Sequence, residues 1–295
     1  MKNVRQLCLG LMLMSMGAIF PVAAYANEAV DTAEVSQPAR PAVSRTEPLN
    51  LEEYLTQSGD EALTYEHTFI GHENETIVAY WNTEDASNYG VTFALYDQEG
   101  QPVPDMYYPN DISINELDGR NIAYQLPSTG EYQFVFTVPA ELSGENKEAV
   151  DYLLRLRVAS FYERAMMMAI ERLEEERFEE SRTGFELAIA QRPESVMPYF
   201  GRLLTIGLAA LESTGMTEWE VLTLEGMEQL FQSLDADEQA LVLSDMQQIT
   251  QNFMTAVESG AVEADALDFE IALLDDVASY LKTGEASEAL REAME

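Results

Sequence analysis

Hydrophobic and polar residues follow two different periods along this chain, and the change between them falls within residues 149–193. Between 152 and 158 apolar side chains occupy every second position, which is typical of a strand with one face on a core. From Phe161 onward the apolar positions have helical spacing. They are Phe161, Ala165, Met168, Ala169 and Leu173. The pattern therefore predicts a β-rich part before this junction and an all-α part after it.

Several short runs before the junction have the composition of β-strands, with β-branched and aromatic residues divided by turn residues. They cover residues 63–71, 75–81, 91–97, 120–126, 131–138 and 149–158. Their even spacing is typical of an antiparallel sandwich or barrel. The segment 49–55, LNLEEYL, is expected to form one or two helical turns. We predict a β-sandwich domain over residues 49–158.

The second half has the pattern of helices throughout. We predict helices at 160–176, 178–191, 196–212, 217–232, 236–258, 262–281 and 285–294. Capping boxes begin at Ser160, Thr217 and Asp235, and Gly215 and Gly260 indicate helix ends. The helical domain is predicted over residues 159–295, so the fold class is an α+β multidomain protein.

Two of these helices carry long apolar stripes at helical spacing. One stripe comprises Leu243, Met246, Ile249, Phe253 and Val257, and the other comprises Val262, Ala266, Phe269, Leu273 and Val277. Such stripes indicate faces that pack against neighbouring helices.

The segment Leu126-Pro127-Ser128-Thr129-Gly130-Glu131-Tyr132 has the chemistry of a tight turn between strands. Proline ends one strand, Gly130 is expected to supply a free φ, and Tyr132 begins the next inward face. With the order of strands over residues 63–158, this turn resembles the L-P-x-T-G-x-Y turn of the bacterial pre-peptidase C-terminal domain family. The resemblance implies a small, jelly-roll-like antiparallel β-sandwich of the kind appended to many secreted proteins.

Residues 162–193 resemble a tetratricopeptide repeat. Small, aromatic and proline residues occupy the repeat's positions at Ala169, Phe178, Ser181, Phe185, Ala188 and Pro193, and a second, degenerate unit begins at Tyr199. The resemblance implies antiparallel helix pairs with a concave face. On its register that face carries Glu163, Met166, Ile170 and Glu174. Together with Phe200 and Leu204, these are the partner-binding residues that we predict.

The N-terminus has the pattern of a secretory signal peptide. Lys2 and Arg5 precede an apolar stretch from Leu7 to Phe20, and Ala24-Tyr25-Ala26 is a typical cleavage site. The apolar stretch is shorter than the ~20 residues that a membrane-spanning helix needs. We therefore predict a signal peptide over 1–26, a disordered linker over 27–48, and export to the periplasm or beyond the cell.

Charge excludes two classes of partner. The chain has 16 Lys and Arg against 53 Asp and Glu, a formal net charge of −37. Nucleic acid phosphates and anionic membrane surfaces would repel such a protein. The acids are spread along the chain, which is typical of a solvated acidic surface suited to a saline environment, and recruitment of a basic partner is the alternative.

Candidate chemistry is sparse. The two histidines, His67 and His72, lack the spacing of a zinc protease motif, and we predict no metal site, no cofactor and no enzymatic activity. Calcium is the cation that the oxygen-rich loop from Asp105 to Asp111 would suit. The motifs S-x-x-K and K-T-G share Lys282 at a helix end, where a lysine followed by glycine is ordinary punctuation.

These observations favour an exported, non-catalytic binding or scaffold protein of the bacterial cell envelope that engages a protein or peptide through its helical domain. The alternative is binding of carbohydrate or a surface polymer by aromatic residues of the sandwich, namely Tyr80, Trp81, Tyr107 and Tyr108. A hydrolase with an acidic active site is the third hypothesis.

Overall fold

The computed structural model describes residues 48–57, 62–83, 91–106, 120–139, 150–260 and 267–293. The predicted signal peptide, and the predicted linker except for Pro48, lie outside these residues. The chain divides into two compact units between Met167 and Met168. We call the described residues up to Met167 the strand unit and those from Met168 onward the helical unit.

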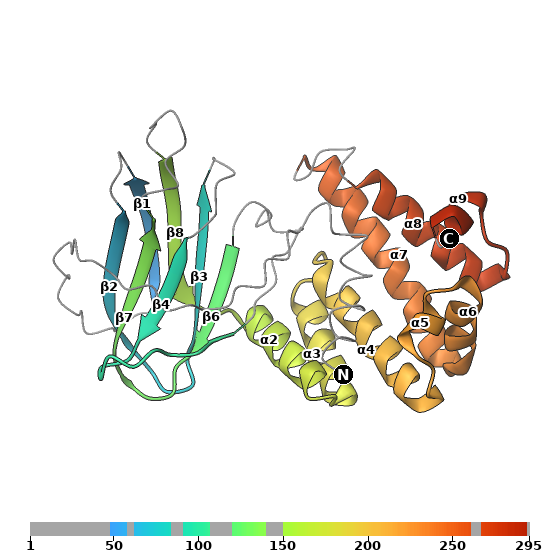
Figure 1. Cartoon of the computed structure of the whole chain (residues 1–295), viewed down its shortest axis with the longest axis horizontal. Coiled ribbons are helices and arrows are strands. Elements are labelled where there is room, and N and C mark those ends of the chain that lie inside the picture. The colour runs from blue at the N-terminus through green and yellow to red at the C-terminus, as the bar shows by residue number, and fades with distance from the viewer. Residues whose placement is uncertain are drawn as a thin grey trace. The chain divides into compact units, whose positions relative to one another are not determined.

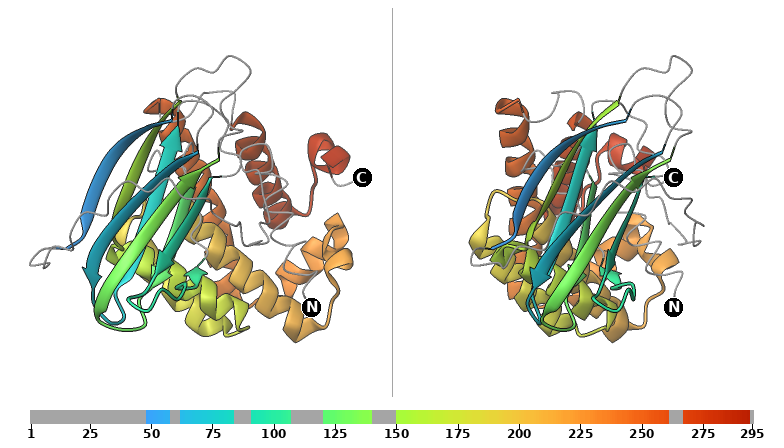
Figure 2. Two further views of the ribbon diagram at one scale, coloured as in Figure 1. Left: turned by 60° about the vertical axis from the view of Figure 1, so that its left-hand side comes forward. Right: turned by 90° about the vertical axis from the view of Figure 1, so that its left-hand side faces the viewer.

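The strand unit contains two antiparallel sheets (Figures 1 and 2). One sheet has the order β1 (Asn50–Gln57), β8 (Val150–Val158), β3 (Thr76–Thr83), β6 (Arg120–Gln125) and β5 (Asp105–Met106). The other has the order β2 (Leu63–Gly71), β7 (Gly130–Val138) and β4 (Thr92–Tyr96). These strands before the junction and the helices after it confirm the predicted α+β layout.

Both sheets contribute to one hydrophobic core. Strand β7 alternates buried and half-buried positions, so that Tyr132, Phe134 and Phe136 point to the same side. Phe136 meets Tyr152 of the other sheet in an edge-to-face contact, with ring centroids 5.9 Å apart. The space between the sheets is therefore filled by aromatic rings.

Two expectations for the strand unit are wrong. Residues 49–55 do not form helical turns, because Asn50–Gln57 is strand β1, paired along its length with β8. The structure also gives Gly130 no positive φ. A Cβ at this residue would lie 3.1 Å from the Gln98 side chain, so close approach rather than backbone freedom favours glycine there.

Helix α2 (Phe161–Glu174) begins in the strand unit and ends in the helical unit. The helical unit continues with α3 (Phe178–Gln191), α4 (Met197–Thr214), α5 (Glu218–Val221), α6 (Leu224–Ser233), α7 (Ala236–Glu258), α8 (Asp268–Thr283) and α9 (Glu288–Ala293) (Figure 1). None of the helices in the described ranges combines the length and apolarity of a membrane span.

The single helix expected over 217–232 is two helices. The break falls at Leu222 and Thr223, because the Thr223 side chain accepts a hydrogen bond from the Gly226 N–H and so caps α6. A Cβ on Gly226 would lie 1.7 Å from the Glu220 carbonyl oxygen. Glycine at 226 thus allows α6 to begin directly against the end of α5.

Small residues bring α2, α3 and α4 close together. The Ser181 hydroxyl donates to the Ala169 carbonyl at 2.8 Å, and a Cβ on Gly184 would lie 2.8 Å from the Ala169 Cβ. Gly201 of α4 similarly leaves room for the Phe185 ring. These contacts use one face of α4. Another face of α4 lines the cavity together with α6, α7 and α8.

Candidate functional site

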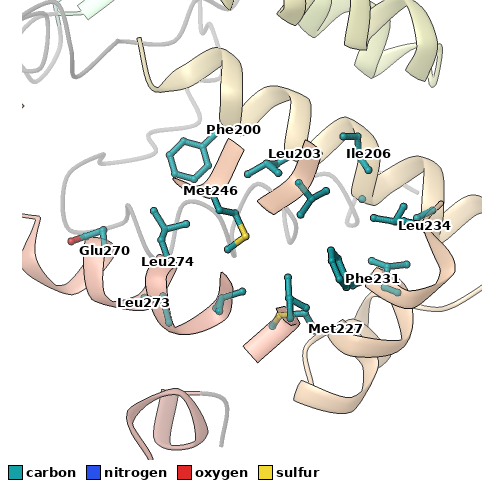
Figure 3. A pocket seen from close by; sticks show the side chains of 16 residues that line it. Phe200, Leu203, Ile206, Met227, Phe231, Leu234, Met246, Glu270, Leu273 and Leu274 are labelled. Carbon is teal, nitrogen blue, oxygen red and sulfur yellow. The ribbon is translucent and has the colours of Figure 1, made fainter. Parts of the chain in front are cut away.

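An apolar cavity of about 330 Å³ lies within the helical unit, between α4, α6, α7 and α8 (Figure 3). Its walls are aliphatic, aromatic and methionine side chains with one carboxylate, that of Glu270. They are Phe200, Leu203, Ile206, Gly207, Ala210, Met227, Leu230, Phe231, Leu234, Val242, Met246, Glu270, Leu273, Leu274, Val277 and Leu281. Such a volume is at the lower end of the range of ligand sites, about 300–1,000 Å³.

Helical periodicity produces these walls. On α4 the lining positions recur at intervals of three or four, from Phe200 through Leu203 and Gly207 to Ala210. Helix α8 repeats the pattern from Glu270 to Leu281. The predicted stripes therefore contribute to the cavity through Met246, Leu273 and Val277, whereas Phe269 of the second stripe is 60% exposed.

Polar contacts outside the cavity connect its walls. Arg202 of α4 donates from Nε and Nη2 to the two carboxylate oxygens of Asp245 on α7, at 2.9 and 2.6 Å. The Asn252 amide of α7 donates to the carbonyls of Pro193 and Ser195, which precede α4. Because these side chains are largely buried, the contacts fix α7 against α4 more firmly than surface pairs would.

Tyr280 forms the corresponding connection between α8 and α6. Its hydroxyl lies 3.0 Å from the Leu224 carbonyl and 3.0 Å from a carboxylate oxygen of Glu228. Desolvation, with a smaller contribution from Glu228, raises the pKa of Tyr280, so the phenol stays protonated and donates. The four walls are thus tied in two pairs, α4 with α7 and α6 with α8.

The charge around the cavity is predominantly negative. No lysine, arginine or histidine occurs between Arg202 and Lys282, although Asp or Glu recurs on each of α5, α6, α7 and α8. Glu270 is only 6% exposed, and no hydrogen bond or ion pair within the described ranges reaches its carboxylate. Figure 3 places it at one end of the lining, beside Leu273 and Leu274. An apolar cavity surrounded by acidic residues favours a ligand in which apolar groups lie next to a cation.

The predicted partner-binding residues have different surroundings. Phe200 is buried and lines the cavity, and Leu204 is half-buried beside it on α4 without lining it. On α2, Met166 is buried, Ile170 is half-buried and Glu174 is exposed. Of the whole set, the structure brings only Phe200 into the cavity.

Glu163 does not face a partner, because the strand unit uses its carboxylate internally. The side chain is 1% exposed and receives Arg157 Nη1 and Nη2 at 2.6 and 2.5 Å and the Ser160 N–H at 2.6 Å. Desolvation alone would raise the pKa of Glu163, but the hydrogen bonds and charge of Arg157 and the bonds from Ser160 outweigh it and lower this pKa. The expected capping box is confirmed. Met166 is also buried.

The aromatic residues of the carbohydrate alternative do not form an exposed surface where the structure describes them. Tyr80 and Trp81 are each 6% exposed. The Trp81 ring lies 4.2 Å from that of Phe93 inside the core, and the Arg155 guanidinium lies over the Tyr80 ring. Tyr107 and Tyr108 lie outside the described residues, as does most of the loop from Asp105 to Asp111 that we considered for calcium.

Histidine chemistry is not assembled in the strand unit. His67 lies in β2 and His72 follows it, and the described parts of the chain contain no group of three His, Cys, Asp or Glu side chains placed to hold a metal ion. Lys282 and Gly284 end α8, with Gly284 in the left-handed conformation at φ 72°. This placement agrees with helix punctuation.

Comparisons with known proteins give little support to any function. No protein-family model matches the sequence, and no curated protein does. Among solved structures, the Aeromonas hydrophila periplasmic inhibitor of g-type lysozyme, PliG, is similar over 40% of this chain and 94% of its own, with 12% identity and a TM-score of 0.26. The propeptide form of the Bacillus licheniformis lipase BlEst2 is similar over 54% of this chain and 29% of its own, with 15% identity and a TM-score of 0.24. Likenesses this weak carry no argument.

Most residues of the cavity were not predicted as binding residues from the sequence. Phe200 was predicted, but Leu203, Phe231 and Glu270 were not. The absence of basic residues between Arg202 and Lys282 was visible in the sequence and could have directed attention to this part of the chain.

Proposed function

We infer that this chain is an exported, non-catalytic binding or scaffold protein of the cell envelope, and that it engages a protein or peptide through its helical unit. The observation that carries this proposal is the apolar cavity between α4, α6, α7 and α8. Natural interiors are close-packed, and unfilled apolar volume costs stability. An apolar cavity whose surrounding helices are held together by hydrogen bonds is therefore the first candidate for a binding site.

The proposed architecture is a jelly-roll-like β-sandwich followed by a repeat-like helical domain. The turn that resembles the pre-peptidase C-terminal family supports the first part, because Tyr132 donates its hydroxyl hydrogen to the Ser128 carbonyl at 2.7 Å and closes that turn. The close helix approach at Ser181 and Gly184 supports the second. Export is supported by the signal-like pattern of residues 1–26.

A capture experiment with a cavity-filling control tests this function. The full chain would be immobilised and exposed to envelope extract, with washes at low and high salt to remove proteins held by the acidic surface alone. The control bait is Gly207→Leu. Gly207 lines the cavity and a Cβ there would meet open space, so the added side chain occupies volume without a clash.

We expect the wild-type bait to retain a salt-resistant protein that the Gly207→Leu bait loses. Equal far-UV circular dichroism of the two baits shows that the fold is unchanged. Retention of the same proteins by both baits would remove the cavity from the function. Retention of polysaccharide instead of protein would favour the carbohydrate hypothesis.

A further inference from the structure

We propose that the occupant of the cavity is a basic amphipathic helix of a partner protein, with its apolar ridge in the cavity and its lysine or arginine side chains against Glu270 and the surrounding acids. This inference rests on the proposed function and specifies the chemistry of the partner. Three observations carry it: the helical walls, the buried residue Glu270 in the lining, and the excess of acidic over basic residues on the wall helices.

The walls determine what kind of chain fits. Four α-helices supply the lining, and the backbone groups within a helix are already paired with each other. An extended peptide would find no sheet edge here to receive its N–H and C=O groups, and their burial without partners is costly. A helix satisfies its own backbone, so it can bury an apolar ridge in such a cavity.

The charge determines the sign of the partner. Helices α5 to α8 carry many acids and a single basic residue, Lys282 in the last turn of α8, so the helices around the cavity are predominantly acidic. On α4, Arg202 is already bound to Asp245 at 2.6 Å. Acyl chains with anionic head groups would be repelled, whereas lysine and arginine would be attracted and oriented.

Glu270 supplies the specific contact. Residue Glu270 is 94% buried and lies beside leucines at one end of the lining, and within the described residues its carboxylate has neither a hydrogen bond nor an ion pair. A cation from a bound helix would satisfy it, and Lys and Arg can reach such a site while their methylene groups lie along apolar surface. Binding of such a cation would therefore give Glu270 a partner that the described residues do not supply.

The test uses the full chain and three synthetic peptides of about five helical turns. All carry leucine at positions i, i+3, i+4 and i+7, and their remaining positions are lysine in the first, glutamine in the second and glutamate in the third. Fluorescence anisotropy measures the dissociation constant of each, and circular dichroism reports helix formation on binding. Each titration is repeated at high salt to suppress long-range attraction.

Three variants locate the binding. Gly207→Leu fills the cavity at unchanged charge, Glu270→Gln removes the buried carboxylate, and Glu258→Gln removes an exposed acid at the end of α7 as a matched control. We expect the lysine peptide to bind at least about tenfold more tightly than the glutamine peptide, and Glu270→Gln and Gly207→Leu each to weaken it about tenfold. Glu258→Gln should change its affinity less than about twofold.

The outcomes separate this inference from the function beneath it. If the glutamine peptide binds as well as the lysine peptide and Gly207→Leu abolishes both, the cavity binds helices but the basic partner is wrong. If the lysine peptide binds all variants equally and high salt releases it, the acidic surface alone attracts it and this inference fails. If no peptide binding depends on Gly207, both the inference and the proposed function lose their support. Thermal unfolding of each variant shows whether a lost affinity reflects a lost fold.

Discussion

The two units of this protein use apolar side chains in opposite ways. In the strand unit, Phe93 lies 5.4 Å from Phe134 and 5.1 Å from Phe136, ring centroid to centroid, and the sheets enclose a filled core. In the helical unit, four helices present equally apolar faces to one another but leave about 330 Å³ open between them. The comparison teaches that apolar composition alone does not separate a core from a binding site. How completely the neighbouring elements fill the space does.

A second contrast concerns one arginine–carboxylate pair in each unit. Both pairs have two-point geometry, Arg157 with Glu163 and Arg202 with Asp245. Glu163 also receives the Ser160 N–H, and its pKa is lowered. For Asp245, desolvation together with the charge of nearby Glu186 outweighs the hydrogen bonds and charge of Arg202, so its pKa is raised. The hydrogen bonds from Ser160 at Glu163 and the like charge of Glu186 near Asp245 thus accompany opposite pKa shifts in two similar pairs.

The largest effect is expected from removing one phenylalanine ring from the core of the strand unit and, for comparison, one from the cavity of the helical unit. Phe134→Ala should lower the free energy of unfolding by about 3–5 kcal/mol, because the ring is fully buried in a filled core. Phe231→Ala should cost about 1–2 kcal/mol, because Phe231 is half-buried and borders volume that is already open. Urea denaturation followed by circular dichroism measures both. Equal losses would mean that the cavity is as well filled as the core.

The pair at the start of α2 should give the next largest effect. Glu163→Ala leaves Arg157 without its carboxylate and the Ser160 N–H without its acceptor, so we expect a loss of about 2–4 kcal/mol. Glu174→Ala on the same helix removes an exposed carboxylate and should change stability by less than about 0.5 kcal/mol. Calorimetric melting of both variants checks this. A loss for Glu174→Ala as large as that for Glu163→Ala would argue against the burial of Glu163.

Two glycines of the helical unit should respond in opposite directions. Gly226→Ala forces a methyl group toward the Glu220 carbonyl and should destabilise by about 1–3 kcal/mol. Gly207→Ala, inside α4 and facing open space, should stabilise by about 0.5–1 kcal/mol. Denaturation midpoints distinguish the two signs. Destabilisation by Gly207→Ala would show that its surroundings are not open.

Lowering the pH should give the smallest effect and should separate the two carboxylates by sign. Because the folded pKa of Glu163 is lowered, its contribution is present above its unfolded pKa and is lost as the pH falls through the folded pKa. The raised folded pKa of Asp245 means that its contribution becomes more favourable as the pH falls through that value. Stability is measured from pH 7 to about pH 2, because the loss at Glu163 falls below its unfolded pKa. As the pH falls, the wild type should lose stability relative to Glu163→Gln and gain stability relative to Asp245→Asn. Parallel curves for both comparisons would contradict the opposite shifts.

Long periodic segments were predictable from sequence. The strand 63–71 and the helices 178–191 and 236–258 have the predicted bounds, because each sustains one period and ends at a turn residue or cap. The segment 49–57 was ambiguous, since Leu51 and Leu55 are four residues apart and share a face in a helix and in a strand alike. Pairing with β8, about a hundred residues later in the chain, decides between them, and no local pattern reports it.

The candidate site was less predictable than the fold. Periodicity identified Met246, Leu273 and Val277 as inward-facing, but it does not report whether the facing helices fill the space between them. The roles of Glu163 and Glu270 depend on their partners in space. Arg157 satisfies the first, whereas the second is buried among leucines. Two acids of similar appearance in the sequence thus have different chemistry in the structure.

The absence of basic residues from 203–281 determines how the protein is digested by proteases. Proteases of trypsin-like specificity cleave after lysine or arginine, and none occurs between Arg202 and Lys282. Digestion by such enzymes, in the test tube or in the surroundings of the cell, releases residues 203–282 as one fragment even after complete unfolding. That fragment contains α6, α7 and most of α4 and α8, so nearly the whole lining of the cavity survives as a single piece.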